Sequence, residues 1–369
     1  MLLYIHIPYC DSKCHYCSFN SYVDKFDTRK AYMIALEKQL KYELNKFKVT
    51  KNSIESIFIG GGTPSTIQPK LYQPIFDLLQ PFIENNAEIT TEANPNSATE
   101  TWLKGMYDLG INRISFGVQS FNPKKLKELN RSHSPENAID AINNAQAIGF
   151  KHISLDLIYN YIGDTKELLN SDINQAFKLP IDHISAYELT IEGGTKFAST
   201  PTVRQEDDEL AFFVADKIKK HGFTHYEISN FGTYQSQHNK GYWELKDYMG
   251  VGAGAVGFLK NRRFYPTTDI DQYIKNFSET TALASSNSGL KPPIPINIIE
   301  EPISDEELLT EKLFLGLRSN IGINENILNK DMKKRANFLV EKEKLSKKEG
   351  SYFNNNYFIS DELVLYILD

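Results

Sequence analysis

The chain has 369 residues, 41% of them hydrophobic, so it can bury a large core and is long enough for a main domain with one or two smaller additions. Its 41 basic and 47 acidic residues give a formal net charge of −6, which disfavours binding to nucleic acid or to an anionic lipid surface. Its three cysteines are an odd number packed closely together, which disfavours a disulfide framework and favours a metal or redox site in a reducing compartment.

The amino-terminal residues form a short apolar run, Met1 to Ile7. This run has no basic flank and meets Pro8 and Cys10 too early for a signal peptide. No later run approaches the ~18 apolar residues of a membrane span. We therefore expect the protein to be cytoplasmic.

Short β-type runs alternate with segments of helical spacing along the first half of the chain. Six such runs are expected, at residues 3–7, 54–59, 88–92, 113–118, 152–158 and 183–189. Several are nearly continuous apolar stretches, which is typical of parallel strands covered on both faces. The segments 28–47 and 135–148 have amphipathic spacing, and Gly149 follows the latter where a helix C-cap belongs. This alternation indicates either a doubly wound sheet or a full or partial barrel.

The unusual residues of the first half follow the ends of the expected strands. Residues 9–17 follow the first run, the glycine-rich residues 60–64 follow the second, Glu92 ends the third, and Gln119 follows the fourth. Barrel sites are built from the carboxyl ends of the strands, so this placement favours a barrel over a doubly wound sheet.

The pattern changes after about residue 225, where glycine and aromatic residues dominate as far as residue 258. Serine, glycine and proline at 285–289 and 291–295 predict a linker. Beyond it we expect a small helical domain with an apolar-periodic segment at 311–317, a charged stretch at 330–348 that is most simply a solvated helix face, and a hairpin at 352–366. The expected units are residues 1–230, 231–300 and 301–369.

Cys10, Cys14 and Cys17 place three thiolates within one loop, which can wrap around three corners of a 4Fe-4S cluster. The fourth iron then lacks a protein ligand and can be chelated by the amino and carboxylate groups of S-adenosylmethionine. Two alternatives stay open. The three thiols could be unrelated buried side chains, or they could bind a tetrahedral zinc ion with His15 or His6 as the fourth ligand.

Polar and glycine residues at neighbouring strand ends could complete such a site. Gly60, Gly61 and Gly62 would let the backbone approach a ligand closely and present N–H donors to a carboxylate, although a glycine run after a strand is more often a tight turn. Further polar groups at or just beyond strand ends could hold the ribose hydroxyls, amino group and carboxylate of the cofactor: Glu92, Gln119, Arg131 and Asp156. Singly, each is more often a surface or capping residue.

At this point the sequence resembles a known family, the anaerobic coproporphyrinogen III oxidase group of radical S-adenosylmethionine proteins, and within it the heme chaperone branch. The resemblance runs nearly end to end. It is carried by residues 4–17, 60–64, 92–95, 115–121, 130–133, 156–159 and 226–231.

The resemblance implies a partial (β/α)6 TIM-like radical SAM barrel with a smaller C-terminal α+β or helical domain. It also implies S-adenosylmethionine contacts at Tyr4, Tyr16, Gly61, Gly62, Thr63, Glu92, Gln119, Arg131 and Asp156. The family usually continues its Asp-Leu-Ile-Tyr motif with Gly-Leu-Pro-Gly, whereas Asn160, Tyr161, Ile162 and Gly163 follow here. The loop after the fifth strand is therefore expected to differ, and the contact at Asp156 depends on its shape.

Two features separate the branches of this family. The oxidase carries a fourth cysteine and a long N-terminal extension, whereas this chain has Phe19 at the corresponding position and only three residues before Tyr4. The chaperone branch carries a His-Asn-x-x-Tyr-Trp signature. It is present here as His238, Asn239, Tyr242 and Trp243, which the resemblance implies to be heme-binding residues.

A neutral imidazole is a good axial ligand to heme iron, and aromatic side chains can pack on a porphyrin, so the signature suits heme. The alternative is a hydrogen-bonded structural histidine.

The leading hypothesis is a protein that binds a 4Fe-4S cluster, S-adenosylmethionine and heme and hands the heme to an acceptor, such as a respiratory, membrane-associated heme protein. The other hypotheses are oxygen-independent coproporphyrinogen III oxidase and a radical enzyme with another substrate. Catalytic residues are not assigned, nucleic acid is not an expected partner, and a homodimer stays open.

Overall fold

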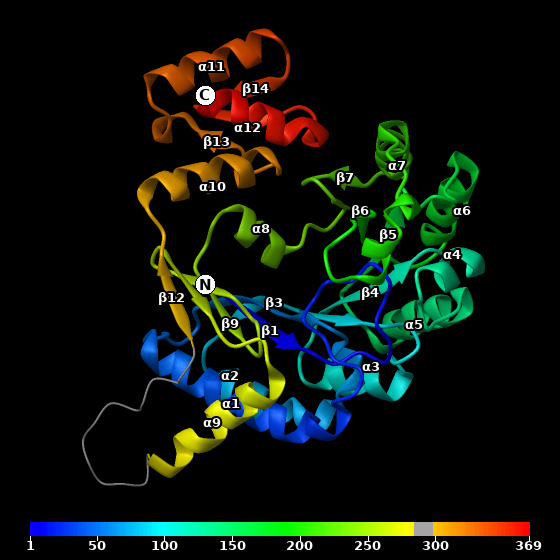
Figure 1. The fold of residues 1–369 in the computed structure, drawn as a ribbon, viewed down its shortest axis with the longest axis vertical. Coiled ribbons are helices and arrows are strands. Elements are labelled where there is room, and N and C mark those ends of the chain that lie inside the picture. The colour runs from blue at the N-terminus through cyan, green and yellow to red at the C-terminus, as the bar shows by residue number, and fades with distance from the viewer. Residues whose placement is uncertain (284–297) are drawn as a thin grey trace.

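The structure is a computed structural model that describes residues 1–283 and 298–369. Its centre is a set of six parallel strands in chain order: β1 (Leu2–Ile7), β2 (Ile54–Gly61), β3 (Ile83–Ala93), β4 (Arg113–Gln119), β5 (His152–Tyr159) and β6 (His183–Glu188). Each pairs with the next, and β1 and β6 pair with other strands instead of with each other. The sheet is therefore a partial barrel of six βα units, which confirms the expected fold (Figure 1).

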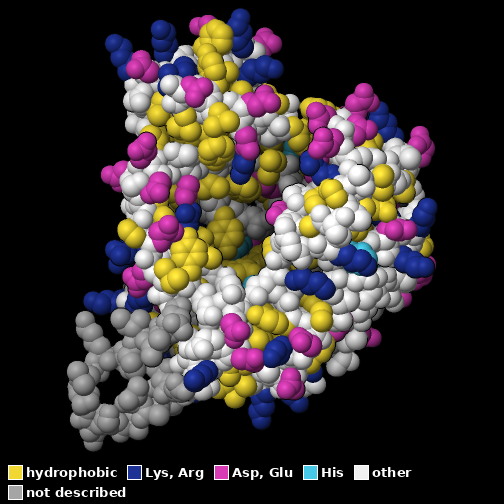
Figure 2. Space-filling model, viewed as in Figure 1, with side chains coloured by type: hydrophobic (Ala, Val, Ile, Leu, Met, Phe, Trp, Pro, Cys, Tyr) yellow, Lys and Arg dark blue, Asp and Glu magenta, His cyan; other side chains and the backbone are white. Residues whose placement is uncertain are grey.

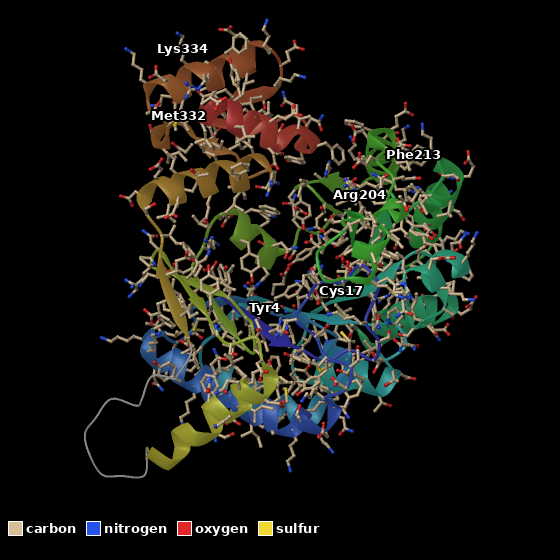
Figure 3. The ribbon with its side chains drawn as sticks, in the orientation of Figure 1. Tyr4, Cys17, Arg204, Phe213, Met332 and Lys334 are labelled. Carbon is tan, nitrogen blue, oxygen red and sulfur yellow. The ribbon has the colours of Figure 1, made fainter. Side chains whose placement is uncertain are left out.

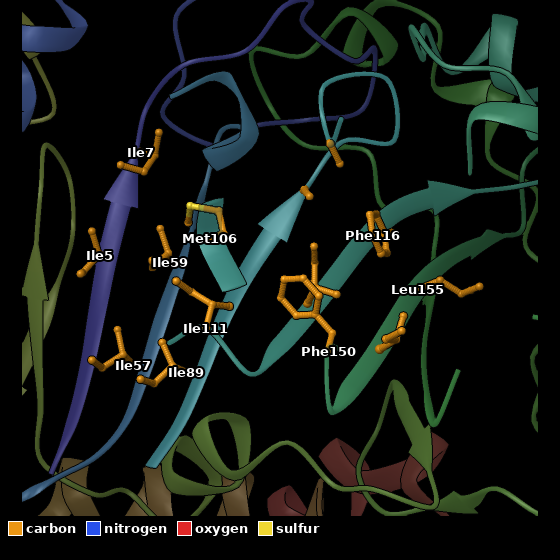
Figure 4. Packing of buried hydrophobic residues seen from close by; sticks show 14 of the residues in the cluster. Ile5, Ile7, Ile57, Ile59, Ile89, Met106, Ile111, Phe116, Phe150 and Leu155 are labelled. Atoms are coloured by element: carbon orange, nitrogen blue, oxygen red, sulfur yellow. The ribbon is translucent and has the colours of Figure 1, made fainter. Parts of the chain in front are cut away.

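Helices cover the outer face of these strands and connect them. They are α1 (Arg29–Lys46), α2 (Gln73–Leu79), α3 (Glu100–Asp108), α4 (Pro123–Glu128), α5 (Pro135–Ile148), α6 (Lys166–Ala176) and α7 (Asp208–Lys220). The largest buried apolar cluster lies between the two layers, where Ile5, Ile57, Ile89 and Phe116 of the strands pack near Met106 of α3 (Figure 4). In the described ranges, no helix is long and apolar enough to cross a membrane.

The predicted helix at 135–148 is confirmed with both of its ends. Ser134 and Asn137 form a reciprocal capping box at the start of α5. Gly149 ends it in the left-handed conformation with φ 111°, which costs a residue without Cβ little.

The inner face of the barrel is polar, in contrast to the nearly continuous apolar runs expected from the sequence. Parallel pairing places Ser56 beside Glu88, and Ser154 beside His183. All four are buried, and they alternate along the strands with apolar residues such as Ile57 that face the helices. Both faces are thus covered, as expected, but one of them is covered by polar side chains that can hydrogen-bond to one another.

The sheet continues beyond β6 at one edge and beyond β1 at the other. After β7 (Thr224–His225), β8 (Asn230–Gly232) pairs antiparallel with β6, whereas β9 (Tyr248–Val251) pairs parallel with β1. The short helix α8 (Gln237–Trp243) connects β8 to β9 and so crosses from one edge of the open barrel to the other. The boundary near residue 230 stays a prediction, although the strands on its two sides share one sheet.

Beyond β9 the sheet is extended by β10 (Gly257–Leu259), β11 (Arg262–Tyr265) and β12 (Ile299–Pro302), with α9 (Ile270–Leu283) packed on α1. The linker predicted at 285–289 and 291–295 lies outside the described residues. The last part of the chain has its own buried cluster, built from α10 (Asp305–Leu317), α11 (Lys330–Glu341), α12 (Ser360–Leu368) and the sheet of β13 (Ile323–Asn324), β14 (Leu345–Lys348) and β15 (Ser351–Asn354).

The hairpin predicted at 352–366 was wrong in position. It is formed by β14 and β15, joined through Glu349 and Gly350, which have φ of 48° and 74°. Two positive φ values in succession are typical of the tight turns that suit a twisted hairpin. Residues 360–368 are helical because Leu363, Val364 and Ile367 form one buried face. Of the charged stretch at 330–348 that was predicted as a helix face, Lys330–Glu341 is helical and the remainder leads into β14.

Candidate functional site

The loop after β1 carries the three cysteines as free, half-buried thiols. A hydrogen bond from the Cys10 N–H to the Tyr22 carbonyl, 3.0 Å long, holds its start, and one from the Cys17 N–H to the Cys14 carbonyl, 3.2 Å, tightens its end. Burial raises the pKa of the Cys10 and Cys17 thiols. A bound cation is therefore needed to favour the thiolate forms of these two side chains.

Two donors from other loops, Thr63 after β2 and Arg131 between α4 and α5, point at the thiols. The Arg131 guanidinium donates to Cys14 Sγ at 3.2 Å, and the Thr63 hydroxyl donates to Cys10 Sγ at 3.4 Å. Arg131 is itself held by the carbonyl of Gly117, at 2.6 Å, and by Asn94 Oδ1. These donors stabilise negative charge on sulfur, as a cluster with thiolate ligands requires.

The zinc alternative needs a fourth ligand: His6 has both ring nitrogens hydrogen-bonded, whereas the Nδ1 contact of His15 leaves its Nε2 able to bind a metal. His6 shares hydrogen bonds with the Tyr4 hydroxyl and the Asn20 carbonyl, both 2.9 Å long, and His15 Nδ1 with the Glu128 carbonyl at 3.0 Å. Within residues 1–283 and 298–369, no three His, Cys, Asp or Glu side chains converge on one metal ion. A 4Fe-4S cluster needs no such convergence because each cysteine binds a different iron, so the three separate thiols fit a cluster better than a single ion.

The glycine run ends β2 against the cysteine loop. The Gly61 N–H donates to Glu92 Oε2 at 3.1 Å, with Gly61 at φ 112°. A Cβ on Gly60 would lie 2.9 Å from the same oxygen, and one on Gly62 would lie 2.7 Å from the Tyr9 carbonyl. These two glycines are required by close approach as well as by the turn, since no larger residue fits.

The predicted carboxylates gather at this end of the barrel. Burial, followed by the nearby charge of Asp156, raises the pKa of Glu92 to about 8, and burial raises the pKa of Asp156 to about 6. Ser115 donates to Asp156 at 3.5 Å. Gln119 ends β4 in the left-handed conformation, φ 70°, which is strained for a residue with Cβ and often marks a functional position. Buried carboxyl groups with raised pKa values are stabilised in their ionised form by a positively charged ligand, so this pair suits such a ligand.

Most of the expected S-adenosylmethionine contacts lie close to one another. Tyr16 lies between two cysteines and is electrostatically coupled to Arg131 and Asp156, and Tyr4 is coupled to Glu92. The structure thus brings these residues to one end of the barrel, while their contacts with the cofactor stay a prediction.

Two polar residues at this end were not predicted from the sequence. Asn94 accepts a hydrogen bond from Arg131. It could have been selected from the sequence, because it is a polar residue two positions after Glu92, just beyond the end of a strand. Tyr187 on the inner face of β6 remains 43% exposed although Asp156 and Glu92 lie near it. Its signal was weaker, because an aromatic residue in a strand is usually part of the core.

The predicted heme motif forms α8, at the opposite, amino-terminal end of the strands. The Glu88 carboxylate of β3 accepts from the N–H groups of Gln237, at 2.9 Å, and His238, at 3.0 Å, and from the Tyr234 hydroxyl at 2.8 Å. Burial opposes ionisation of Glu88, but Arg113 and these donors outweigh it and lower its pKa. A buried carboxylate thus fixes the amino terminus of α8 to the barrel.

His238 is fully buried, and both ring nitrogens are hydrogen-bonded: Nδ1 to Ser56 Oγ at 2.8 Å and Nε2 to the Tyr242 hydroxyl at 2.9 Å. Burial lowers the pKa of His238 to about 3, so the imidazole is neutral. Asn239 and Trp243 are half-buried. This arrangement is that of the structural histidine considered above, and the heme role of the four motif residues stays a prediction.

The surface is hollowed near α8, between the barrel and the C-terminal part of the chain (Figure 2). Tyr4 and Cys17 lie near the centre of the same view, Tyr4 just below α8 (Figure 3). Three rings follow one another from α8 toward the cysteine loop: His238 lies 5.3 Å from Phe58, and Phe58 lies 6.3 Å from Tyr4, between ring centroids. Phe58 and Tyr4 are half-buried, and aromatic side chains of this kind suit a flat apolar ligand.

Glu227, between β7 and β8, is a buried acid, 1% exposed and with Oε1 lacking a partner. Burial raises its pKa to about 8, so the folded chain binds a proton that the unfolded chain releases above pH 4.5. Stability is therefore lost as the pH rises from 5 to 8. We expect Glu227→Gln to remove about 2 kcal/mol of this loss, measured by urea unfolding at both pH values. If both proteins lose the same unfolding free energy between pH 5 and 8, Glu227 does not carry the raised pKa.

The profile of the Radical SAM superfamily matches residues 4–175. The chain is 32% identical over 331 residues to the heme chaperone HemW of Lactococcus lactis, covering 87% of this chain and 82% of that one, and 38% identical over 283 residues to HemW of Haemophilus influenzae, covering 74% and 73%. The solved structure of coproporphyrinogen III oxidase HemN from Escherichia coli superposes with a TM-score of 0.80 over 99% of this chain and 89% of that one, at 17% identity. This structural similarity shows the fold.

Proposed function

The chain belongs to the HemW family within the Radical SAM superfamily, and on this premise we propose that it binds a 4Fe-4S cluster, S-adenosylmethionine and heme and transfers the heme to an acceptor protein. The observation that carries the heme part is α8, whose neutral imidazole packs against the aromatic ring of Phe58. The three thiols without a fourth ligand carry the cluster part.

Cys10, Cys14 and Cys17 would hold the cluster, with Arg131 and Thr63 stabilising the thiolates. Tyr4, Tyr16, Gly61, Gly62, Thr63, Glu92, Gln119, Arg131 and Asp156 would hold S-adenosylmethionine. When bound, the two groups together supply one-electron chemistry at a sulfonium. The chain's own contribution is to position the ligand: a backbone approach at the glycines, and carboxylates whose raised pKa falls when a cation arrives.

His238, Asn239, Tyr242 and Trp243 would hold the heme, with His238 as axial ligand. The acceptor is proposed to be a respiratory heme protein, met on the cytoplasmic side of the membrane. Segment 231–300 is proposed as a heme-motif unit with its linker, between a barrel at 1–230 and a C-terminal unit at 301–369. A homodimer is a further proposal.

The second candidate is oxygen-independent coproporphyrinogen III oxidase, which the fold favours because it matches HemN. Phe19 argues against it: the side chain is 66% exposed at the position where that branch carries a fourth cysteine.

We expect the cluster-loaded chain not to decarboxylate coproporphyrinogen III. The measurement is carbon dioxide release under anaerobic conditions with S-adenosylmethionine and a reductant. Turnover on the order of 1 per second, ordinary for enzymes, would move the assignment to the oxidase.

A further inference from the structure

The imidazole of His238 lies between two hydroxyls that belong to different elements, β2 and α8. Ser56 Oγ, on the Nδ1 side, belongs to β2, a central strand paired on both sides. The Tyr242 hydroxyl, on the Nε2 side, lies one helical turn along α8 from His238 itself. Its half-buried side chain packs edge-on against Tyr248, 4.8 Å between ring centroids. Ser56 is therefore a fixed partner, and Tyr242 is a partner that a side-chain rotation can remove.

A second buried histidine with one serine and one tyrosine partner lies elsewhere in the barrel. His183 is fully buried, shares a hydrogen bond of 2.7 Å with Ser154 Oγ through Nδ1, and another of 2.7 Å with the Tyr226 hydroxyl through Nε2. Tyr226 is also fully buried, and its oxygen accepts from the Ser236 N–H at 3.2 Å. This tyrosine has no freedom to leave, so the His183 set is a purely structural counterpart of the His238 set.

We propose that the Tyr242 hydroxyl occupies, in the heme-free chain, the position at His238 Nε2 that heme iron takes, and that Ser56 is the residue that positions the imidazole for this exchange. The inference rests on the proposed heme function of α8. With the proton on Nδ1, the Nδ1–H donates to Ser56 Oγ and the Nε2 lone pair accepts the Tyr242 O–H. The same tautomer serves iron once Tyr242 has turned away, so the ligand needs no proton transfer to become competent.

The first test is Tyr242→Phe, which removes the competing hydroxyl and keeps the aromatic ring that would hold the heme. Since a neutral hydrogen bond is worth about 0.5–1.5 kcal/mol, hemin should bind roughly threefold to tenfold more tightly than to the wild type. The same affinity as the wild type, or a weaker one, would overturn the exchange.

The second test is Ser56→Ala, which removes the fixed partner. Loss of such an outer contact to a histidine ligand weakens metal binding by roughly 10- to 100-fold. It should also lower the iron–histidine stretching frequency in resonance Raman spectra of the ferrous heme complex, because the imidazole becomes less basic. An unchanged frequency would show that Ser56 does not position the ligand.

Ser154→Ala and Tyr226→Phe are the matched controls, since they remove the corresponding hydroxyls around His183. They should leave hemin affinity and the stretching frequency unchanged. If they shift either readout as much as the His238-set variants do, the effects are structural and the inference is wrong. His238→Ala separates the inference from the proposal beneath it: wild-type hemin binding in that variant would remove the heme function of α8 itself, whereas lost binding there with unaltered Tyr242→Phe and Ser56→Ala would remove only the inference.

Discussion

Replacement of Cys14 by alanine is expected to abolish the cluster, the largest effect that a single substitution should have on this protein. Cys14 is the thiol that Arg131 contacts, and the loop holds only two other cysteines, each of which would bind a different iron. Anaerobic reconstitution should give about four iron atoms per wild-type chain and close to none in the variant. Iron and sulfide analysis, with the absorption of the cluster, measures this.

Asp11→Asn is the control for this experiment, since Asp11 lies in the same loop, is exposed, and accepts a long hydrogen bond of 3.5 Å from the Asn96 side chain. It should retain the cluster. An intact cluster in Cys14→Ala, or one zinc ion per chain in the native protein, would contradict the assignment of the loop.

The second large effect is expected from Lys125, which forms a buried ion pair with Asp164. Their side chains are 2% and 0% exposed, the pair distance is 2.7 Å, and Lys125 also donates to the Ile158 carbonyl at 2.5 Å. Lys125→Met leaves the carboxylate buried without its cation, which costs about 3–5 kcal/mol of unfolding free energy. Denaturant unfolding measures the loss.

The same pair joins the loop after β5 to α4, which leads into the residues that hold the cysteine loop. Asn130, two residues beyond α4, donates to the Lys13 carbonyl at 2.8 Å. Lys125→Met should therefore also speed the release of iron from the loaded protein. The exposed neighbour Lys124 provides the control, as Lys124→Met, and the double change Lys125→Met with Asp164→Leu should recover much of the stability because no lone charge remains. A single variant as stable as Lys124→Met would refute this account of the pair.

The six-strand barrel and the cysteine loop could be predicted from the sequence because their signals are local. The strands are short β-type runs with helical segments between them, and the cysteines lie within eight positions of one another. Gly149 could be predicted as a helix end for the same reason, since its left-handed φ depends on its own residue type.

The polar inner face and the environment of His238 could not be predicted in this way, because they depend on contacts between residues far apart. Ser56 and His238 are separated by 182 positions, and Glu88 and His238 by 150. The misplaced hairpin has another cause. Strand and helix spacing are both compatible with a short apolar run, and only packing against the other helices of the C-terminal part made residues 360–368 helical.

The proposal that this chain carries heme is tested most directly by titrating the cluster-loaded wild-type protein with hemin under anaerobic conditions and following the Soret band. The account predicts saturation at one heme per chain, with a spectrum of histidine-ligated iron. A titration without saturation, or one with the spectrum of free hemin throughout, would contradict it.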